Sequence, residues 1–316
     1  MPEANSHGVQ HAAFLYLSVN TVCRYMAPLL RSFRSLLASR PARRVALWGL
    51  GMAVSISPSL AQVNISGKAG LLYVPTATIL SDGTFHAGYG YNPVNYAFRF
   101  NPDANPVIRT RNAESIFFVN LVVLPRLELN VNLLRPNGPI MYGDRGIGDR
   151  QIDVKYGLLT ERADRPSVAV IVSVPLGIDN SLVTNAIVAT KHVTVSPAVE
   201  LELTAGYASP YYVDRADMRN DQNSTLFSGF VLRDKRDMKS YYLAGPIGGV
   251  KASLSRKGGL MVEWDSQHLN LGGYATLFKR WTVQAGVVNF DQLTFGTSYA
   301  FSLLSTKHST GHDKAK

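Results

Sequence analysis

The seven histidines are the side chains best suited to acid–base chemistry, and their spacing argues against an active site. A hydrolase needs a histidine hydrogen-bonded to a nucleophile and oriented by a carboxylate. Four histidines stand near the chain ends, namely His7, His11, His308 and His312. The others, His86, His192 and His268, lie far apart on predicted strands, and only His86 and His268 fall on the predicted inner face. No Gly-x-Ser-x-Gly, His-Glu-x-x-His or phosphate-loop motif accompanies them, so we expect no catalytic residue and no enzyme.

Paired carboxylates are the second arrangement that could do chemistry. Glu200 and Glu202 stand two residues apart, so on a strand they face the same way, as the two acids of a glycoside hydrolase must. A water-filled lumen balanced by Arg126, Lys155 and Lys251 explains the same pair without hydrolysis. We favour the lumen.

Cysteine usage excludes several site classes. The only cysteine, Cys23, lies in a segment that we expect to be removed. The mature chain would then lack a disulfide, a thiolate zinc site and a thiol nucleophile. We predict neither a metal nor a cofactor.

Residues 1–61 read as a secretory signal peptide with an N-terminal extension, and translation starting at Met26 would give a leader of ordinary length. A basic stretch that ends in Arg43-Arg44 precedes the apolar run 45–56, which is too short to span a bilayer comfortably. Small residues then predict cleavage between Ala61 and Gln62. The leader carries +5 of the net charge of +10, which leaves a mild +5 for the rest, and we expect no nucleic-acid partner.

The mature sequence alternates apolar with polar residues in short segments, as strands with two different faces do. In 127–133, for example, Leu127, Leu129 and Val131 alternate with Glu128 and Asn130. About fourteen such segments occur, including 95–100 and 225–232, separated by Pro-, Gly- and Asp-rich breaks. We therefore predict an all-β fold, a transmembrane antiparallel up-and-down β-barrel of 12–14 strands over 84–304. Residues 62–83 would precede the first strand and 305–316 would form a polar tail.

Charges fall on one face of these strands, which favours a membrane barrel over a soluble β-sandwich. The inner face is predicted to hold Arg126, Glu128, Asp153, Lys155, Glu200, Glu202, Lys251 and Glu263. Aromatic residues stand toward many strand ends, as in interfacial girdles. Whether the lumen is open, or filled by 62–82, stays undecided at this point.

The last predicted strand carries a terminal pattern. Gly296, Tyr299 and Phe301 occupy the positions polar-x-Gly-x-x-aromatic-x-aromatic in Thr294–Phe301. This is similar to the signal that the barrel-assembly machinery recognises in its clients, although here a polar tail follows it.

Three sequence blocks resemble the YjbH-type exopolysaccharide-biosynthesis proteins. The first contains Gly70-Leu71-Leu72-Tyr73-Val74-Pro75-Thr76-Ala77 and the later Asp82-Gly83-Thr84; the second begins at Gly148-Asp149-Arg150; the third joins Gly249-Val250-Lys251 to Gly259–Asp265 and Asn270-Leu271-Gly272. The resemblance implies an outer-membrane barrel of a Gram-negative bacterium that supports exopolysaccharide biosynthesis or export. Its implied partners are outer-membrane lipid, the assembly machinery, polysaccharide and components of an export system. The eight inner-face charges named above are then the candidate polysaccharide contacts. A general diffusion porin and an outer-membrane hydrolase stay open as alternatives.

Overall fold

The computed structural model describes residues 62–93, 113–137, 149–175, 182–215, 230–238 and 242–302. The predicted leader, the polar tail and the segment 95–100 lie outside these ranges. The strands are β1 (Thr84–Asn92), β2 (Glu114–Leu124), β3 (Leu127–Pro136), β4 (Asp149–Leu159), β5 (Ser167–Pro175), β6 (Ala186–Ser196), β7 (Val199–Ala208), β8 (Tyr211–Arg215), β9 (Phe230–Asp234), β10 (Gly245–Leu254), β11 (Gly258–Trp264), β12 (Leu269–Leu277), β13 (Trp281–Val288) and β14 (Gln292–Ser302). A single described 3-10 turn, η2 (Lys235–Met238), follows β9.

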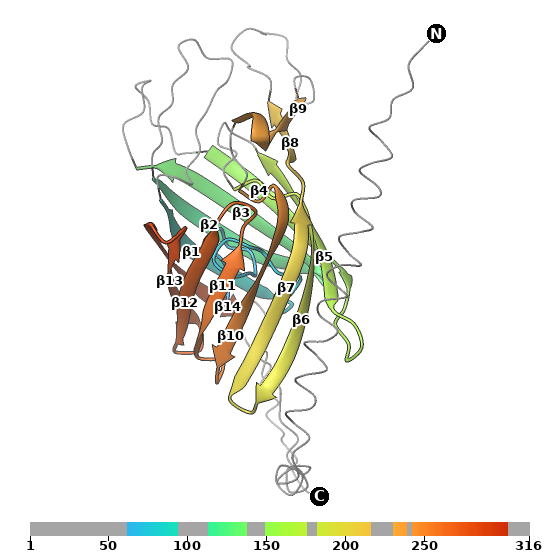
Figure 1. Cartoon of the computed structure of the whole chain (residues 1–316), viewed down its shortest axis with the longest axis vertical. Helices are drawn as coiled ribbons and strands as arrows, with labels where there is room; N and C mark the ends of the chain where they lie inside the picture. The colour runs from blue at the N-terminus through green and yellow to red at the C-terminus, as the bar shows by residue number, and fades with distance from the viewer. Residues whose placement is uncertain are drawn as a thin grey trace, which may run out of the picture. The chain divides into compact units, whose positions relative to one another are not determined.

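Twelve of these strands close into one antiparallel barrel in the order β1-β14-β13-β12-β11-β10-β7-β6-β5-β4-β3-β2 (Figure 1). Neighbours in the barrel are neighbours along the chain, apart from the step from β7 to β10 and the closure of β1 on β14. That closure runs from the pair Thr84–Ser302 to the pair Tyr91–Phe295. The prediction of an all-β, up-and-down barrel with 12–14 strands is therefore confirmed. Closure leaves no strand edge to be solvated, which is the condition for a sheet to lie in lipid.

The described part of the predicted segment 225–232 does not belong to the barrel wall. The described strand there is β9, which begins at Phe230 and pairs only with β8 in a separate two-stranded sheet. Next to it, Ser209 donates its backbone N–H to the carbonyl of Asn185, just before β6 (2.6 Å). This small sheet thus belongs to one end of the barrel and not to its wall.

Side chains alternate between the lumen and the outer surface. In β2, Ile116 and Phe118 are buried inside, whereas Phe117 and Val119 are exposed outside. The exposed large apolar residues of the barrel strands form a surface that only a lipid environment would cover.

Outward aromatic side chains mark both ends of the wall. Trp281 and Tyr299 are register partners near one end, while Tyr207 and Trp264 stand at the other. Such rings fit the two membrane–water interfaces. No helix among the described residues is long and apolar enough to cross a membrane.

Connection lengths orient the barrel. The turns that join β2 to β3, β6 to β7, β10 to β11 and β12 to β13 are tight, and this end has no described connection longer than 160–166. The longest connections, such as 209–244, lie at the opposite end, together with the short turn 289–291. Short turns face the periplasm and long loops face outward in barrels of this kind. The end with Thr84 and Ser302 is therefore the periplasmic end.

The wall predicts a depth-dependent response to charge. Val131 lies on the outer face of the middle of β3, and Leu124 lies on the outer surface at the periplasmic end of β2. Val131→Arg should cost about 2–4 kcal/mol of folding free energy and Leu124→Arg about 0–1 kcal/mol. Urea unfolding of the refolded barrel in lipid vesicles measures both, and equal losses would contradict the orientation of this wall.

Candidate functional site

The lumen is filled by the chain's own segment Gln62–Gly83, which we call the plug. Figure 1 shows it as the blue coil among the barrel strands. Every residue from Gln62 to Thr76 is buried, including the side chains of Lys68 and Tyr73. The question that the sequence left undecided is thereby answered: these residues occupy the lumen.

The outermost part of the plug, residues 72–74, is held by one carboxylate of β11. Glu263 accepts backbone N–H bonds from Leu72, Tyr73 and Val74, at 2.9 to 3.1 Å, and a further bond from the Asn270 amide. Three successive amides around one carboxylate fix the backbone of this turn, because charge-assisted bonds are about twice as strong as neutral ones. The Tyr73 hydroxyl also donates to Asn92 Oδ1 (3.0 Å).

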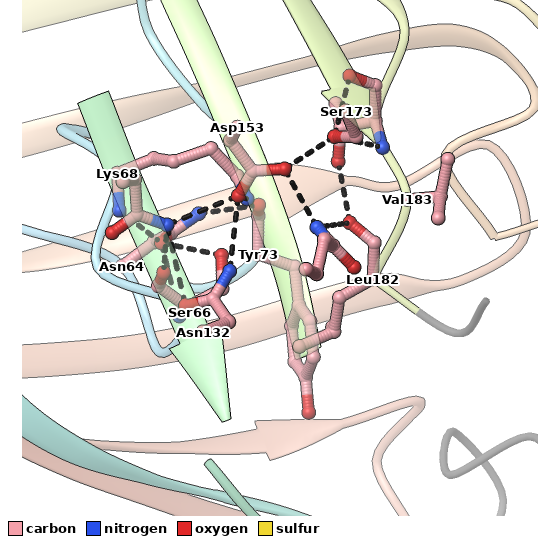
Figure 2. Close-up of polar contacts among 12 residues, drawn as sticks. Asn64, Ser66, Lys68, Tyr73, Asn132, Asp153, Ser173, Leu182 and Val183 are labelled. Carbon is pink, nitrogen blue, oxygen red and sulfur yellow. Dashed lines mark hydrogen bonds and ion pairs between the residues drawn. The ribbon is translucent and has the colours of Figure 1, made fainter. Parts of the chain in front are cut away.

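Asp153 of β4 is the hub of a second set of contacts (Figure 2). It pairs with Lys68 of the plug, and both side chains are almost fully buried. Its oxygens also accept bonds from Asn130, Asn132, Gln151 and Ser173. Every lone pair of this buried carboxylate therefore has a donor, which is the condition under which a buried ion pair persists.

Toward the periplasmic end, the wall binds main-chain groups of the plug. Glu128 accepts from the Leu80 N–H (2.5 Å), and Thr190 accepts from the Ala77 N–H (2.8 Å). Lys155 donates to the Thr78 carbonyl and lies 3.7 Å from Glu128.

Glycines on the wall make room for the plug's leucines. A Cβ on Gly249 would lie 2.5 Å from Leu71, and Cβ atoms on Gly272 or Gly286 would lie 3.0 Å or less from Leu72. Gaps of this size leave no place for a larger side chain. The wall and the plug are thus shaped to each other at the same three strands, β10, β12 and β13.

Six of the eight predicted lumen charges lie where the sequence placed them. They are Glu128, Asp153, Lys155, Glu202, Lys251 and Glu263, all buried on the inner face. Four of the six, Glu128, Asp153, Lys155 and Glu263, bond the plug directly. Their predicted contact with polysaccharide stays a prediction, since in this conformation the plug occupies them.

Two predicted lumen residues lie elsewhere. Arg126 is exposed in the turn between β2 and β3 with φ of 74°, and it donates to Thr160 Oγ1 (2.9 Å). The alternating pattern runs through this residue, but the turn ends the alternation before it. Glu200 is half-buried at the periplasmic rim, 3.9 Å from Arg256 in the next turn.

The three described histidines lie in different parts of the barrel. His86 is buried in β1, and His268 precedes β12 outside the strand. His192, which the sequence did not place inside, faces Glu161 (2.6 Å) and Glu202 (3.3 Å) near the periplasmic rim, and Lys251 pairs with the same Glu202 (2.7 Å). Among the described residues, no group of three or more His, Cys, Asp or Glu side chains could hold a metal ion.

A second closure lies at the outer end. Lys235 of η2 is buried, and its ammonium donates to the carbonyls of Val183 and Tyr242 (3.3 Å for the latter). The ring of Tyr242 stands edge-on to that of Tyr73, with centroids 5.2 Å apart. We call Lys235 and the two loops that it joins the cap. The cap therefore contacts the outermost part of the plug, at Tyr73.

The plug is the functional feature that sequence reasoning left unassigned. The signal for it was the block Gly70–Ala77, which is apolar and glycine-containing yet has no alternation. A non-alternating apolar segment next to a charged lumen has to be buried by something other than lipid.

Taken together, a closed wall with an apolar outside, aromatic girdles and a polar lumen defines an outer-membrane-type β-barrel whose lumen is plugged. A family model described as "YjbH: Exopolysaccharide biosynthesis protein YbjH" matches residues 62–316, so the chain belongs to the YjbH family. The matched range covers the plug as well as the barrel.

Solved structures resemble the chain only distantly. A "KdgM porin" is 8% identical with a TM-score of 0.37, over 69% of this chain and 98% of that one. A "Bacterial polysaccharide outer membrane secretin" is 10% identical with a TM-score of 0.25, over 71% of this chain and 100% of that one. Likeness at this level carries no argument about function. No curated protein matches the chain.

The space that Gly249, Gly272 and Gly286 leave for Leu71 and Leu72, which we call the glycine niche, leads to a prediction about the plug. Gly272→Leu should displace Leu72, since overpacking costs about 1–3 kcal/mol, and so raise the plug-out population by about one to two orders of magnitude. Conductance in planar bilayers should rise. Gly273→Leu, on the adjacent residue that faces outward, is the matched control and should conduct as the wild type does. Adding Leu72→Gly to Gly272→Leu should restore the low conductance. If none of these three outcomes is observed, the niche does not hold the plug in place.

Lys235 predicts a pH dependence of stability. Burial lowers its pKa to about 7 from the ordinary 10.5, with the charge of Lys68 acting in the same direction and Asp153 against it. Between pH 7 and 10.5 the unfolded chain binds more protons at this site, so stability should rise with pH, by at most about 1.4 kcal/mol per unit. Lys235→Met should remove this part of the slope. Urea midpoints at pH 6, 7.5 and 9 test it, and an unchanged slope in the variant would refute the assignment.

Proposed function

We propose that this protein is a non-enzymatic barrel of the outer membrane that supports the biosynthesis or export of exopolysaccharide, and that its plug closes the lumen at rest. The observation that carries the proposal is membership of the YjbH family across both plug and barrel. The lumen chemistry supports it, because amides, hydroxyls and paired charges line the wall where a polyhydroxylated chain would have to pass.

The two alternatives are weaker. A general diffusion porin needs an open aqueous lumen, whereas here Gln62–Thr76 is buried inside the wall. A hydrolase needs a nucleophile or an acid pair in reach of a histidine or a water. Of the described histidines, His192 is bonded to the carboxylates of Glu161 and Glu202, and His268 donates its backbone N–H to Asp265 (2.7 Å).

The proposal predicts a loss of secreted polymer without a loss of permeability. Deleting the gene should lower secreted exopolysaccharide, and the wild-type gene in trans should restore it. Uptake of small sugars and the level of an unrelated porin serve as controls. The reverse pattern, with normal polymer and reduced sugar uptake, would establish the porin alternative. Purified protein should also show low conductance in planar bilayers until the plug is displaced.

A further inference from the structure

Three neutral polar side chains form a row on the inner wall beside the plug. His86 of β1 is the register partner of Asn120 of β2, and Asn120 is the partner of Asn130 of β3. Each is no more than 2% exposed. We call these three residues the amide row.

The amide row has hydrogen-bonding atoms without partners among the described residues. They are Nε2 of His86, both amide atoms of Asn120 and Oδ1 of Asn130. Buried polar atoms in proteins are nearly always bonded, and each one that is not weakens the fold. Asn120 is the extreme case, since its whole side-chain amide is buried in the wall and bonds nothing among the described residues. The row therefore carries donors and acceptors that the described part of the chain leaves unused.

The chemistry of the row selects the kind of guest. Asn120 offers two donors and an acceptor, Asn130 an acceptor, and the imidazole either role. The row's wall neighbours are Ala300 on one side and Asp153 on the other, and Asp153 is already saturated by Lys68 and its amide donors. A neutral set of mixed donors and acceptors matches vicinal hydroxyl groups, each of which donates and accepts. It offers no cation for a phosphate and no free carboxylate for a metal.

The plug covers the row. Asn130 donates to the Ser66 carbonyl (2.8 Å), and Gly67, with φ of 85°, lies so close that a Cβ there would be 2.6 Å from Asn130 Oδ1 and 2.4 Å from Phe118. Only glycine fits this approach. Movement of residues 66–67 away from the wall would therefore open the row to the lumen.

We propose that His86, Asn120 and Asn130 form a subsite for the hydroxyl groups of an uncharged sugar unit, covered by Ser66 and Gly67 while the plug is in place. This rests on the proposed function and deepens it. The proposed sugar contact thus shifts from the charged residues, four of which bond the plug, to three neutral ones that were not among the predicted contacts.

The test uses an apolar replacement of similar size. Asn120→Leu removes an amide that bonds no described residue, so the full-length barrel should keep or gain thermal stability in the gel-mobility assay. Secreted polymer in a strain whose only copy carries this variant should fall about tenfold, on the scale of one or two lost neutral hydrogen bonds. Asn120→Ser, which keeps a donor and an acceptor, should retain part of the secretion.

Asn132→Leu is the matched control, because its amide does bond Asp153 (3.0 Å). This variant should lose stability. If Asn120→Leu loses stability to the same extent, the row is a structural element and the subsite is refuted. If Asn120→Leu secretes as the wild type does, the row holds only water and the subsite is again refuted. Normal secretion after deletion of the whole gene would instead refute the proposed function, so the two failures are distinguishable.

Discussion

Charge buried inside a closed wall is the constraint on which this structure depends. A barrel wall can be lipid-facing outside and charged inside only if the inner charges meet water or partners. Here Asp153 and Glu263 lie at about 1% exposure, where an unpaired carboxylate would cost several kcal/mol. The plug supplies what they need, an ammonium from Lys68 and a turn of backbone amides at 72–74. Wall and plug are thus one folding unit.

The same interdependence limits how the lumen can open. The contacts of Lys68, Leu72 and Tyr73 fall within one short stretch, and they involve opposite sides of the wall, β4 on one hand and β11 to β13 on the other. Withdrawing any one of them strains the others, since the backbone between them is short and its amides are bonded to Glu263. The plug is therefore expected to leave as a body, and a partial withdrawal would strand a buried carboxylate.

The wall could be predicted from the sequence because its physics is local. Alternation at period two follows from strand geometry alone, and it placed residues such as Asp153 and Lys155 correctly on the inner face. It failed where a turn interrupts it, as at Arg126. Three hairpins turn on pairs with positive φ that lack glycine, Ser255-Arg256, Phe278-Lys279 and Asn289-Phe290, so the usual turn signals were weak. The segment that contains β9 was predicted to be a barrel strand, because the sequence pattern of a strand does not show which other strand it pairs with.

The plug and the amide row could not be predicted for a different reason. The plug is held to the wall, and the row is covered by the plug, through contacts across more than fifty residues of sequence, such as Glu263 with Tyr73 and Asn130 with Ser66. Alternation assigns Asn120 and Asn132 the same inner face. Only the three-dimensional arrangement shows that Asn132 bonds Asp153, while Asn120 bonds no described residue. The sequence pattern identifies the residues that face the lumen, and the contacts in the folded chain determine which of them can still bind a ligand.

The two closures of the lumen are mechanically connected, and this sets an order of events. The cap rests on the plug through the Tyr73–Tyr242 ring contact, and Lys235 ties Tyr242 to the loop before β6. A guest arriving from the periplasm meets the plug first, and moving Tyr73 removes the support beneath Tyr242. A guest arriving from outside would have to break the buried Lys235 contacts before it reached the plug at all. The order in which the contacts break therefore depends on the side of entry: from the periplasm the bonds of Ala77, Thr78 and Leu80 break first, and from outside those of Lys235.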